Sequence, residues 1–588
     1  MNGNLTKAAA IQGHLHVVVL LTTGMIASWA APRAAAQNTI VDIQSFRIEK
    51  TAAIADPSGQ ARARVKFINL NPAINAWYIL EVEWVPGMPA QTYHLENPDP
   101  TNTRVDLDPK FPQGLMIQEG SAPPSPCALT EHKEDSPLEA GKKSDRNYVE
   151  LCNGKLYLRN PGEGRETSKE MVVDFLRRHV WGGEKITSFV KDAFYKDKYI
   201  LMSNLKKADE AAGASVPLPK KESAPPKALV SGLRKTKMTV APVDLGLDLG
   251  AMTGRDLEVG AWYPVNTSPG IMVSVIEPDA IRPDILESYP ERARKLDATE
   301  GTALSYVVAF DMSKHNIGFA LGTKHPSMEW SERSLPEIRK KDTKGPDGFD
   351  SAEPVIRTGG INPVDSARVV ATFIAGYKRS HGAFKWGELA QKNQGSHYGF
   401  VENGVVFSRL VPDLATMVIY KDGHMDMKNW TEEDNKTLDQ VRHARQNGVS
   451  VVEWDSAANR AIPGIYVAKW TQGNWSGSHE SQQRTLRAGA CLVKDGDKTW
   501  LLYAYFSGAT SNAMARVFQA YQCNYGMHLD MNALEHTYLA VYSQTEKGFT
   551  IQHLISGMNV LDRPVGGVVV PRFVGAADNR DFFFMMKK

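Results

Sequence analysis

Six polar side chains in the C-terminal half of the chain have types suited to acting together on a charged substrate. They are Asp530, Arg487, His381, Lys378, Asn532 and Asn447. A carboxylate such as Asp530 can serve as nucleophile or general base, and a histidine such as His381 can transfer a proton near neutral pH. Arg487 offers a planar fork that fits phosphate oxygens, whereas Lys378 would act as a point charge.

The elements around Asp530 indicate how it is positioned. The run 525–531 (YGMHLDM) predicts a strand, so Asp530 is expected at a strand end, which opens onto loops where substrates bind. Before this strand, Thr510 or Ser511 is expected to cap a helix. Its apolar face is formed by Met514, Val517, Phe518 and Tyr521.

Three tight-turn dipeptides lie between runs of β-forming residues. They are Asn403-Gly404, Asp422-Gly423 and Asp495-Gly496. Such dipeptides predict hairpins and therefore antiparallel pairing. Strands mixed with isolated helices indicate an α+β fold, with a C-terminal mixed, largely antiparallel sheet and helices packed on it.

The N-terminus has the layout of a secretory signal peptide over residues 1–36. Lys7 precedes an apolar stretch, and Ala34–Ala36 offer a small-residue cleavage site. An uncleaved membrane anchor is the alternative, because the stretch approaches membrane length. We expect an exported protein, periplasmic or extracellular, with no integral membrane span after cleavage.

The rest of the chain divides by composition. Residues 38–205 contain β-type runs at 63–68 and 77–84 and predict a β-rich module with short helices. Residues 206–236 combine Ala, Lys, Ser and Pro with few large apolar side chains, which is typical of a linker. Residues 240–588 then form the second folded domain.

Composition excludes several classes of protein. The chain has 68 Lys and Arg against 66 Asp and Glu, so a bulk electrostatic nucleic-acid binder is not expected. We find no phosphate-binding loop, dinucleotide fingerprint, paired-histidine helix or nucleophile elbow, so no cofactor is expected, and any metal requirement stays unknown.

Four cysteines in an exported chain can form disulfides. Cys127 with Cys152 and Cys491 with Cys523 is one arrangement, but spacing alone leaves three pairings open, and some cysteines could stay free.

Several segments, taken in order, resemble the phosphodiester glycosidase domain family, whose type member removes N-acetylglucosamine from a phosphodiester. The resemblance covers roughly residues 250–588. It is carried by FIAGYKRSHGAF (373–384), the hairpins of 397–430, RQN (445–447), RAGACLVKDG (487–496) and MHLDMN (527–532). Leu529-Asp530 matches the strongest motif of the family, and Arg487 matches an Arg that precedes a hairpin, with Arg484 as the alternative. Ile374 stands where the family has Asn.

The resemblance implies cleavage of a sugar C1–O–phosphate bond, for which a carboxylate near C1 and cations around the phosphate are needed. We expect Asp530, Arg487 and His381 to be catalytic, and Lys378, Asn532 and Asn447 to bind a glycan or sugar-phosphodiester substrate.

Each residue also has a structural interpretation. Asp530 could cap a turn, Arg487 and Lys378 could be exposed strand charges, and His381 could be a surface histidine. Asn532 could satisfy loop backbone groups, and Asn447-Gly448 could stop a helix that begins near Thr431. We therefore consider a second hypothesis, that the chain is a non-catalytic envelope protein that binds glycan or a partner. Ile374 favours this second function, and the retained charged residues favour the first.

Overall fold

The structure, a computed structural model, describes residues 38–588 apart from 56–60, 85–88, 131–135, 165–231, 235–237, 325–329, 332–333, 340–344, 380–381, 383, 385–386, 393–398, 470–483, 546–547 and 566–567. By their contacts, Asn38–Lys588 form one unit. The predicted signal peptide, most of the predicted linker and the helices expected just before it lie outside the described residues. Among the described residues, no helix is long and apolar enough to cross a bilayer.

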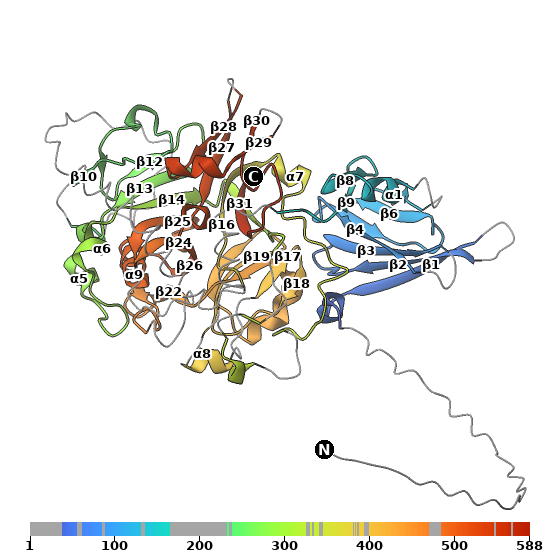
Figure 1. Ribbon diagram of the computed structural model, residues 1–588, viewed down its shortest axis with the longest axis horizontal. Helices are drawn as coiled ribbons and strands as arrows, with labels where there is room; N and C mark the ends of the chain where they lie inside the picture. Colours follow the sequence, from blue (N-terminus) through green and yellow to red (C-terminus); the bar gives the residue numbers. More distant parts are fainter. Residues whose placement is uncertain are drawn as a thin grey trace, which may run out of the picture. The chain divides into compact units, whose positions relative to one another are not determined.

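The predicted α+β class with packed helices is wrong. The structure is 42% strand and 15% helix, and every ladder between the described strands is antiparallel (Figure 1). The described α-helices other than α9 span only four to six residues, as listed by their bounds: α1 (Pro137–Lys142), α5 (Pro283–Leu286), α6 (Ala298–Thr302), α7 (Pro363–Ser366) and α8 (Gly387–Lys392).

The N-terminal part is built on a six-stranded sheet. Its strands, in spatial order, are β1 (Ile48–Ala55), β2 (Ala61–Asn69), β3 (Trp77–Glu83), β4 (Gln91–Glu96), β9 (Leu156–Arg159) and β8 (Tyr148–Leu151). The two β-type runs predicted from the sequence, 63–68 and 77–84, are confirmed as β2 and β3. A three-stranded sheet accompanies it: β5 (Thr103–Asp106), β6 (Gly114–Glu119) and β7 (Ser125–Ala128).

An eight-stranded sheet forms the centre of the C-terminal part. Its strands, in spatial order, are β12 (Trp262–Pro264), β13 (Ile271–Ile276), β14 (Ser305–Asp311), β25 (Lys498–Ala509), β24 (Thr485–Asp495), β26 (Tyr525–Met531), β22 (Ser450–Asp455) and β23 (Arg460–Pro463). Helix α9 (Ser511–Ala520) connects β25 to β26 and is fully buried. Thr510 caps it by accepting the amide proton of Asn512, so the predicted cap, helix and strand are confirmed.

Two five-stranded sheets complete this part. One contains β15 (His315–Ala320), β31 (Phe582–Lys587), β16 (Val369–Ile374), β27 (Leu539–Thr545) and β28 (Gly548–His553). The other contains β18 (Val405–Ser408), β17 (Phe400–Glu402), β21 (Val441–Gln446), β19 (Ala415–Tyr420) and β20 (Met425–Asn429). The three predicted hairpins are confirmed: β17–β18, β19–β20 and β24–β25 turn at the three dipeptides.

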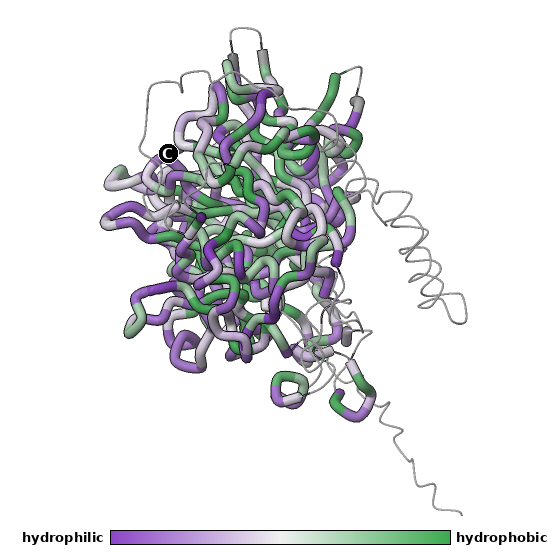
Figure 2. Tube along the Cα trace, turned by 90° about the vertical axis from the view of Figure 1, so that its left-hand side faces the viewer, coloured by the Kyte–Doolittle hydropathy of each residue, from purple (hydrophilic) through white to green (hydrophobic). Residues whose placement is uncertain are grey.

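The predicted class is wrong because another sheet packs against the central sheet where helices were expected. All seven residues of β14 are buried. The ring of Phe373 on β16 lies 6.0 Å from that of Phe310 on β14 and 5.3 Å from that of Tyr503 on β25, centroid to centroid. A five-stranded sheet therefore covers a face on which helices were expected, and Figure 2 shows the hydrophobic segments gathered largely inside, with hydrophilic loops at the edges.

The stretch after Thr431 is a second correction. The predicted helix is a short 3-10 segment, η6 (Glu433–Gln440), and residues 441–446 are strand β21. Asn447-Gly448 therefore ends a strand and does not stop a helix. Val441, His443 and Ala444 pack in the interior, so burial between neighbouring strands overrides the local helical pattern.

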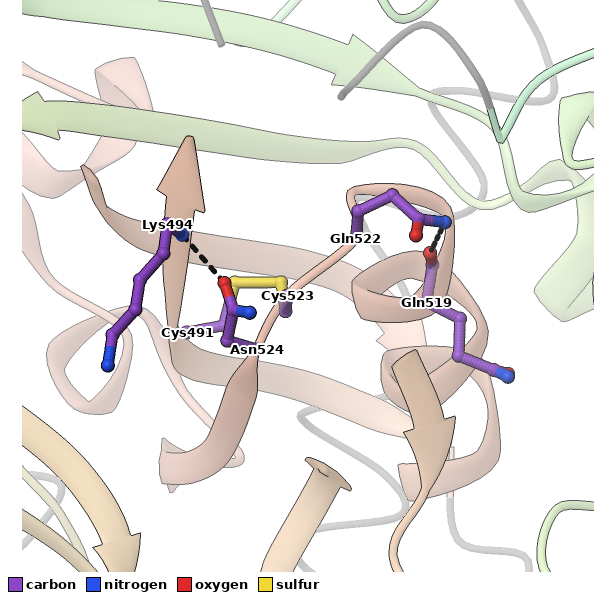
Figure 3. Close-up of a disulfide and its surroundings, with 6 residues drawn as sticks. All are labelled: Cys491, Lys494, Gln519, Gln522, Cys523 and Asn524. Atoms are coloured by element: carbon purple, nitrogen blue, oxygen red, sulfur yellow. Dashed lines mark hydrogen bonds between the residues drawn. A yellow bond between two sulfur atoms is a disulfide. The ribbon is translucent and has the colours of Figure 1, made fainter. Parts of the chain in front are cut away.

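All four cysteines form disulfides, Cys127 with Cys152 and Cys491 with Cys523. The second bond ties β24 to the turn after α9 (Figure 3). Beside it, the side chain of Asn524 accepts the amide proton of Lys494 over 2.6 Å, again on β24. The end of α9, and with it the start of β26, is thereby fixed against the central sheet.

Candidate functional site

Strand β26 carries three titratable side chains, Tyr525, His528 and Asp530, in a run of seven buried residues, and the last two lie towards its carboxyl end. It lies between β24 and β22 in the central sheet. A register shift between Arg487 and Gly489 on β24 places Arg487 opposite Met531. The guanidinium of Arg487 therefore reaches the carboxyl end of β26, where Asp530 lies.

Asp530 forms a buried ion pair with Arg580. Arg580 Nη1 donates to Asp530 Oδ2 over 2.7 Å, and the two side chains are 3% and 6% exposed. The other oxygen, Oδ1, accepts the amide proton of Met531 over 2.8 Å. The turn-capping interpretation thus describes one oxygen, while the other accepts a charge-assisted hydrogen bond from Arg580.

Arg580 also bonds His536, the last residue of the short segment η7 (Leu534–His536). Arg580 Nη2 lies 2.6 Å from His536 Nε2. Because a guanidinium can only donate, Nε2 accepts, and the imidazole proton is assigned to Nδ1, which donates to Met531 O over 2.9 Å. His536 therefore shares its arginine with Asp530.

A second arginine–histidine pair lies at the same strand. Arg487 Nη1 donates to His528 Nε2 over 2.8 Å, and Arg487 Nε donates to Ala509 O over 2.6 Å. By the same reasoning the proton of His528 is on Nδ1, which lies 2.8 Å from Leu529 O and 2.7 Å from the hydroxyl oxygen of Tyr377. Tyr377, His528 and Arg487 form one continuous chain of hydrogen bonds.

Burial shapes the protonation of this chain. It lowers the pKa of Arg487 to about 10, against the opposing influence of Tyr377 and Glu300. Burial, followed by the charge of Arg487, lowers the pKa of His528 well below its ordinary range, and the hydrogen bond to Leu529 opposes this. His528 therefore stays neutral around neutral pH.

Asn447 ties the loop after β16 to β26. Its Oδ1 accepts the amide proton of Tyr377 over 3.1 Å, and its Nδ2 donates to His528 O and Leu529 O over 2.7 and 2.8 Å. Arg445 supports the same loop by donating to Tyr377 O over 2.7 Å, and it pairs with Asp581 over 2.5 Å. Asn447 thus positions the loop, and its contact with substrate stays a prediction.

The remaining predicted residues lie nearby in the chain. Lys378 is only 6% exposed and follows Tyr377 directly. Arg487 is 0% exposed, so the interpretation of these two as exposed strand charges is wrong. Asn532 has a left-handed backbone with φ of 84°, and its buried Oδ1 has no hydrogen-bond partner. His381 lies outside the described residues.

Sequence reasoning missed four residues of the site: Tyr377, His528, His536 and Arg580. A histidine two positions before an aspartate in an apolar strand was one available indication. The run Asp578–Asp581 was another, because it places three charged residues directly before the aromatic strand β31, and all four of its side chains are buried. Charged residues are rarely buried unless they are paired.

Among the described residues there is no group of three or more His, Cys, Asp or Glu that could hold a metal ion.

No protein-family model matches the chain, and no curated protein does. Solved structures show remote similarity. The catalytic domain of zebrafish N-acetylglucosamine-1-phosphodiester alpha-N-acetylglucosaminidase, auto-inhibited by its pro-peptide, has a TM-score of 0.29 and 10% identity over 55% of this chain and 85% of that chain. An exported-protein candidate of Burkholderia pseudomallei has a TM-score of 0.21 and 10% identity over 48% and 74%.

A hypothetical protein from Synechocystis has a TM-score of 0.23 and 9% identity over 92% of this chain and 99% of that chain. A glycosidase and an exported-protein candidate are thus remote structural neighbours. At these scores the similarity alone carries no functional argument.

Proposed function

We propose that this chain is an exported glycosidase that hydrolyses a sugar 1-phosphodiester or a related envelope glycan. The observation that carries the proposal is the end of β26, where Asp530 is paired with Arg580 and the guanidinium of Arg487 bonds His528 on the same strand. The order of sequence motifs that resembles the phosphodiester glycosidase domain family supports it.

The proposed reaction breaks the bond between sugar C1 and the bridging oxygen, which leaves with the phosphate as a phosphomonoester. Water supplies the new oxygen on C1, and its proton goes to Asp530 acting as base. Arg580 holds the Asp530 carboxyl group in place for this role, and Arg487 with Lys378 would offset the charge of the phosphate. His381 is the candidate for proton transfer, and Asn532 for contact with the sugar.

The partial exposure of residues beside Asp530 supports its proposed role. Asp530 itself is 4% exposed, whereas Asn532 and His536 beside it are half-buried.

Export is part of the proposal. All four cysteines are paired in two disulfides, which is the state expected in an oxidising compartment. Residues 1–36 would direct export, and residues 206–236 would link the β-rich module 38–205 to the catalytic domain 240–588.

The test measures release of sugar from a 1-phosphodiester donor by the purified chain. Asp530→Asn should lower the rate about 10²- to 10⁴-fold, the range for loss of a positioned acid or base. Because Asp530 is in a buried ion pair, its loss also destabilises the fold, so rates are compared per folded molecule. Glu96→Gln is the matched control: it removes another buried, arginine-paired carboxylate, in the N-terminal sheet, and should leave that rate unchanged.

A non-catalytic envelope protein that binds glycan or a partner is the second candidate. The full burial of Arg487 favours it, because this guanidinium already bonds Ala509 O and His528. Absence of turnover with saturable glycan binding in calorimetry would support this candidate and reject the glycosidase.

A further inference from the structure

A small cavity, partly open to solvent, lies where the N-terminal six-stranded sheet meets the C-terminal sheets. We call it the junction cavity, and it is lined by Trp77, Glu96, Tyr148, Asn362, Glu402 and His443, among others. Its volume is about 20 Å³, enough for about one water molecule. Two glutamates from different sheets, Glu96 from β4 and Glu402 from β17, therefore line the same small space.

Glu96 has the nearer cation. Arg159 Nε at the end of β9 lies 3.2 Å from Glu96 Oε2, and both side chains are at most 3% exposed. Asn362 Nδ2 donates to Glu96 Oε1 over 2.9 Å. The guanidinium carbon of Arg159 lies 3.4 Å from the ring centroid of Trp77. Burial raises the pKa of Glu96, and Arg159 and Asn362 oppose that rise. Of the two carboxyl groups, Glu96 is the one with a cation at ion-pair distance.

Glu402 is 5% exposed and lies in the same buried surroundings. Burial raises its pKa to about 8; Arg159 and the hydrogen bond from the Leu321 amide oppose the rise, and the charges of Glu96 and Asp581 add to it. Two carboxylates that share one arginine in a low dielectric cannot both ionise without a large cost.

Other charged groups also surround the pair. Asp365 lines the cavity from α7, lies 4.0 Å from Arg368, and its charge adds to the rise in the pKa of Glu96. Arg442 on β21 donates to Asn403, and the charge of Glu402 raises the pKa of Arg357 against the lowering effect of burial. Burial keeps His443 on β21 and His94 on β4 neutral by lowering the pKa of each, and it raises the pKa of Tyr148 on β8.

Unsatisfied polar atoms at the cavity point the same way. Glu96 Oε2 and Arg159 Nε lie 3.2 Å apart as an ion pair without hydrogen-bond geometry, and Arg159 Nη2 is also buried without a hydrogen-bond partner. Water that enters when the junction opens can satisfy these atoms. The contact between the two sheets is therefore sensitive to the charge that this cavity holds.

We propose that Glu96 and Glu402 share one proton across this junction, and that rising pH weakens the contact between the N-terminal sheet and the C-terminal sheets. When the junction opens, water solvates Glu402 and the proton leaves at a lower pH than in the closed state. The open state is therefore favoured progressively as pH rises from the ordinary range of a glutamate towards 8, and the effect levels off above 8.

Hydrogen exchange of the full chain between pH 5 and pH 9, with exchange times corrected for intrinsic rates, tests this. In the wild-type chain, protection of peptides from β4, β9 and β17 should fall by up to about tenfold per pH unit below pH 8 and then level off. In Glu402→Gln, protection of these peptides should not change with pH. Asp497→Asn, an exposed turn carboxylate, is the control and should follow the wild type.

A second variant keeps the test decisive if Glu402→Gln does not fold. Glu96→Gln removes the competing charge and leaves Arg159 to Glu402, so the pH at which protection levels off should move down by at least one unit. Three results would each overturn the proposal. The first is wild-type protection that does not vary with pH, and the second is a wild-type pH response in Glu402→Gln. The third is an unchanged pH at which protection levels off in Glu96→Gln.

Discussion

Arg580 joins Asp530 to His536: its Nη1 donates to the carboxylate over 2.7 Å and its Nη2 to the imidazole Nε2 over 2.6 Å. The three residues come from β26, from the turn just before β31 and from η7. One guanidinium therefore fixes both the position of the Asp530 carboxyl group and the tautomer of His536, which makes Arg580 the central positioning group at this strand end.

A double-mutant cycle should show strong coupling between Asp530 and Arg580. Asp530→Asn and Arg580→Met should each lower the free energy of unfolding by about 3–5 kcal/mol, because each leaves a buried partner uncompensated. In urea unfolding, the loss of stability in the double variant should be smaller than the sum of the two single losses by roughly 2–3 kcal/mol. The exposed pair Lys436–Glu433 is the control, with coupling below about 1 kcal/mol. Additive losses at Asp530 and Arg580 would contradict the structure.

His94 should make the fold sensitive to acid. Burial, with Arg159 and Lys142, lowers its pKa to about 3, so between about pH 3 and 6.5 the unfolded chain binds a proton that the folded chain does not. Stability should fall as pH drops through this window. His94→Gln should reduce the slope of unfolding free energy against pH by up to about 1.4 kcal/mol per unit.

The exposed His424 provides the comparison for that measurement. If His424→Gln flattens the pH dependence of urea unfolding as much as His94→Gln does, the effect does not come from burial.

Removing the Cys491–Cys523 bond should destabilise the C-terminal part. The two cysteines are 32 residues apart, and closing a loop of that length stabilises by roughly 3–4 kcal/mol in the chain-entropy description. Cys491→Ser with Cys523→Ser should show this loss in denaturant unfolding. Peptide mapping without reduction checks the pairing itself, and a peptide that links Cys491 to Cys127 or Cys152 would refute it.

Ile374→Asn, which introduces the residue that the glycosidase family has at this position, should damage the protein. Ile374 is 0% exposed and pairs with Phe582 in the sheet. An amide buried there without partners should cost about 2–5 kcal/mol in thermal or urea unfolding. Ile374→Val, which keeps the position apolar, should cost about 0.5–1.5 kcal/mol. Equal stability of the two variants would show that an amide finds partners at this site.

Local patterns predicted the elements well where the deciding residues are close in sequence. The Asp495-Gly496 turn and its flanking β formers give β24–β25, and Thr510 with an apolar face gives α9. The fold class was missed because it depends on what covers a strand, and β16 lies about 130 residues from β25, which it packs against. The helix predicted for residues 441–446 was wrong for the same reason.

The site was predictable only in part. Asp530 and Arg487 were found as charged residues at the ends of apolar runs, and both lie at the carboxyl end of β26. Their hydrogen-bond partners were not predicted, because Arg580 is 50 residues from Asp530 and Tyr377 is 151 residues from His528. No rule of sequence spacing connects residues so far apart. Because a buried charge needs a partner, the sequence predicts that partners exist, but it does not predict which residues they are.

Strand β31 lies between β15 and β16, and the run that precedes it supplies Arg580 and Asp581. A ribosome that has not yet made residues 578–587 has therefore produced a chain that lacks the strand between β15 and β16 and the arginine that pairs with Asp530. The sheet and the ion pair can be completed only after residues 578–587 have been synthesised.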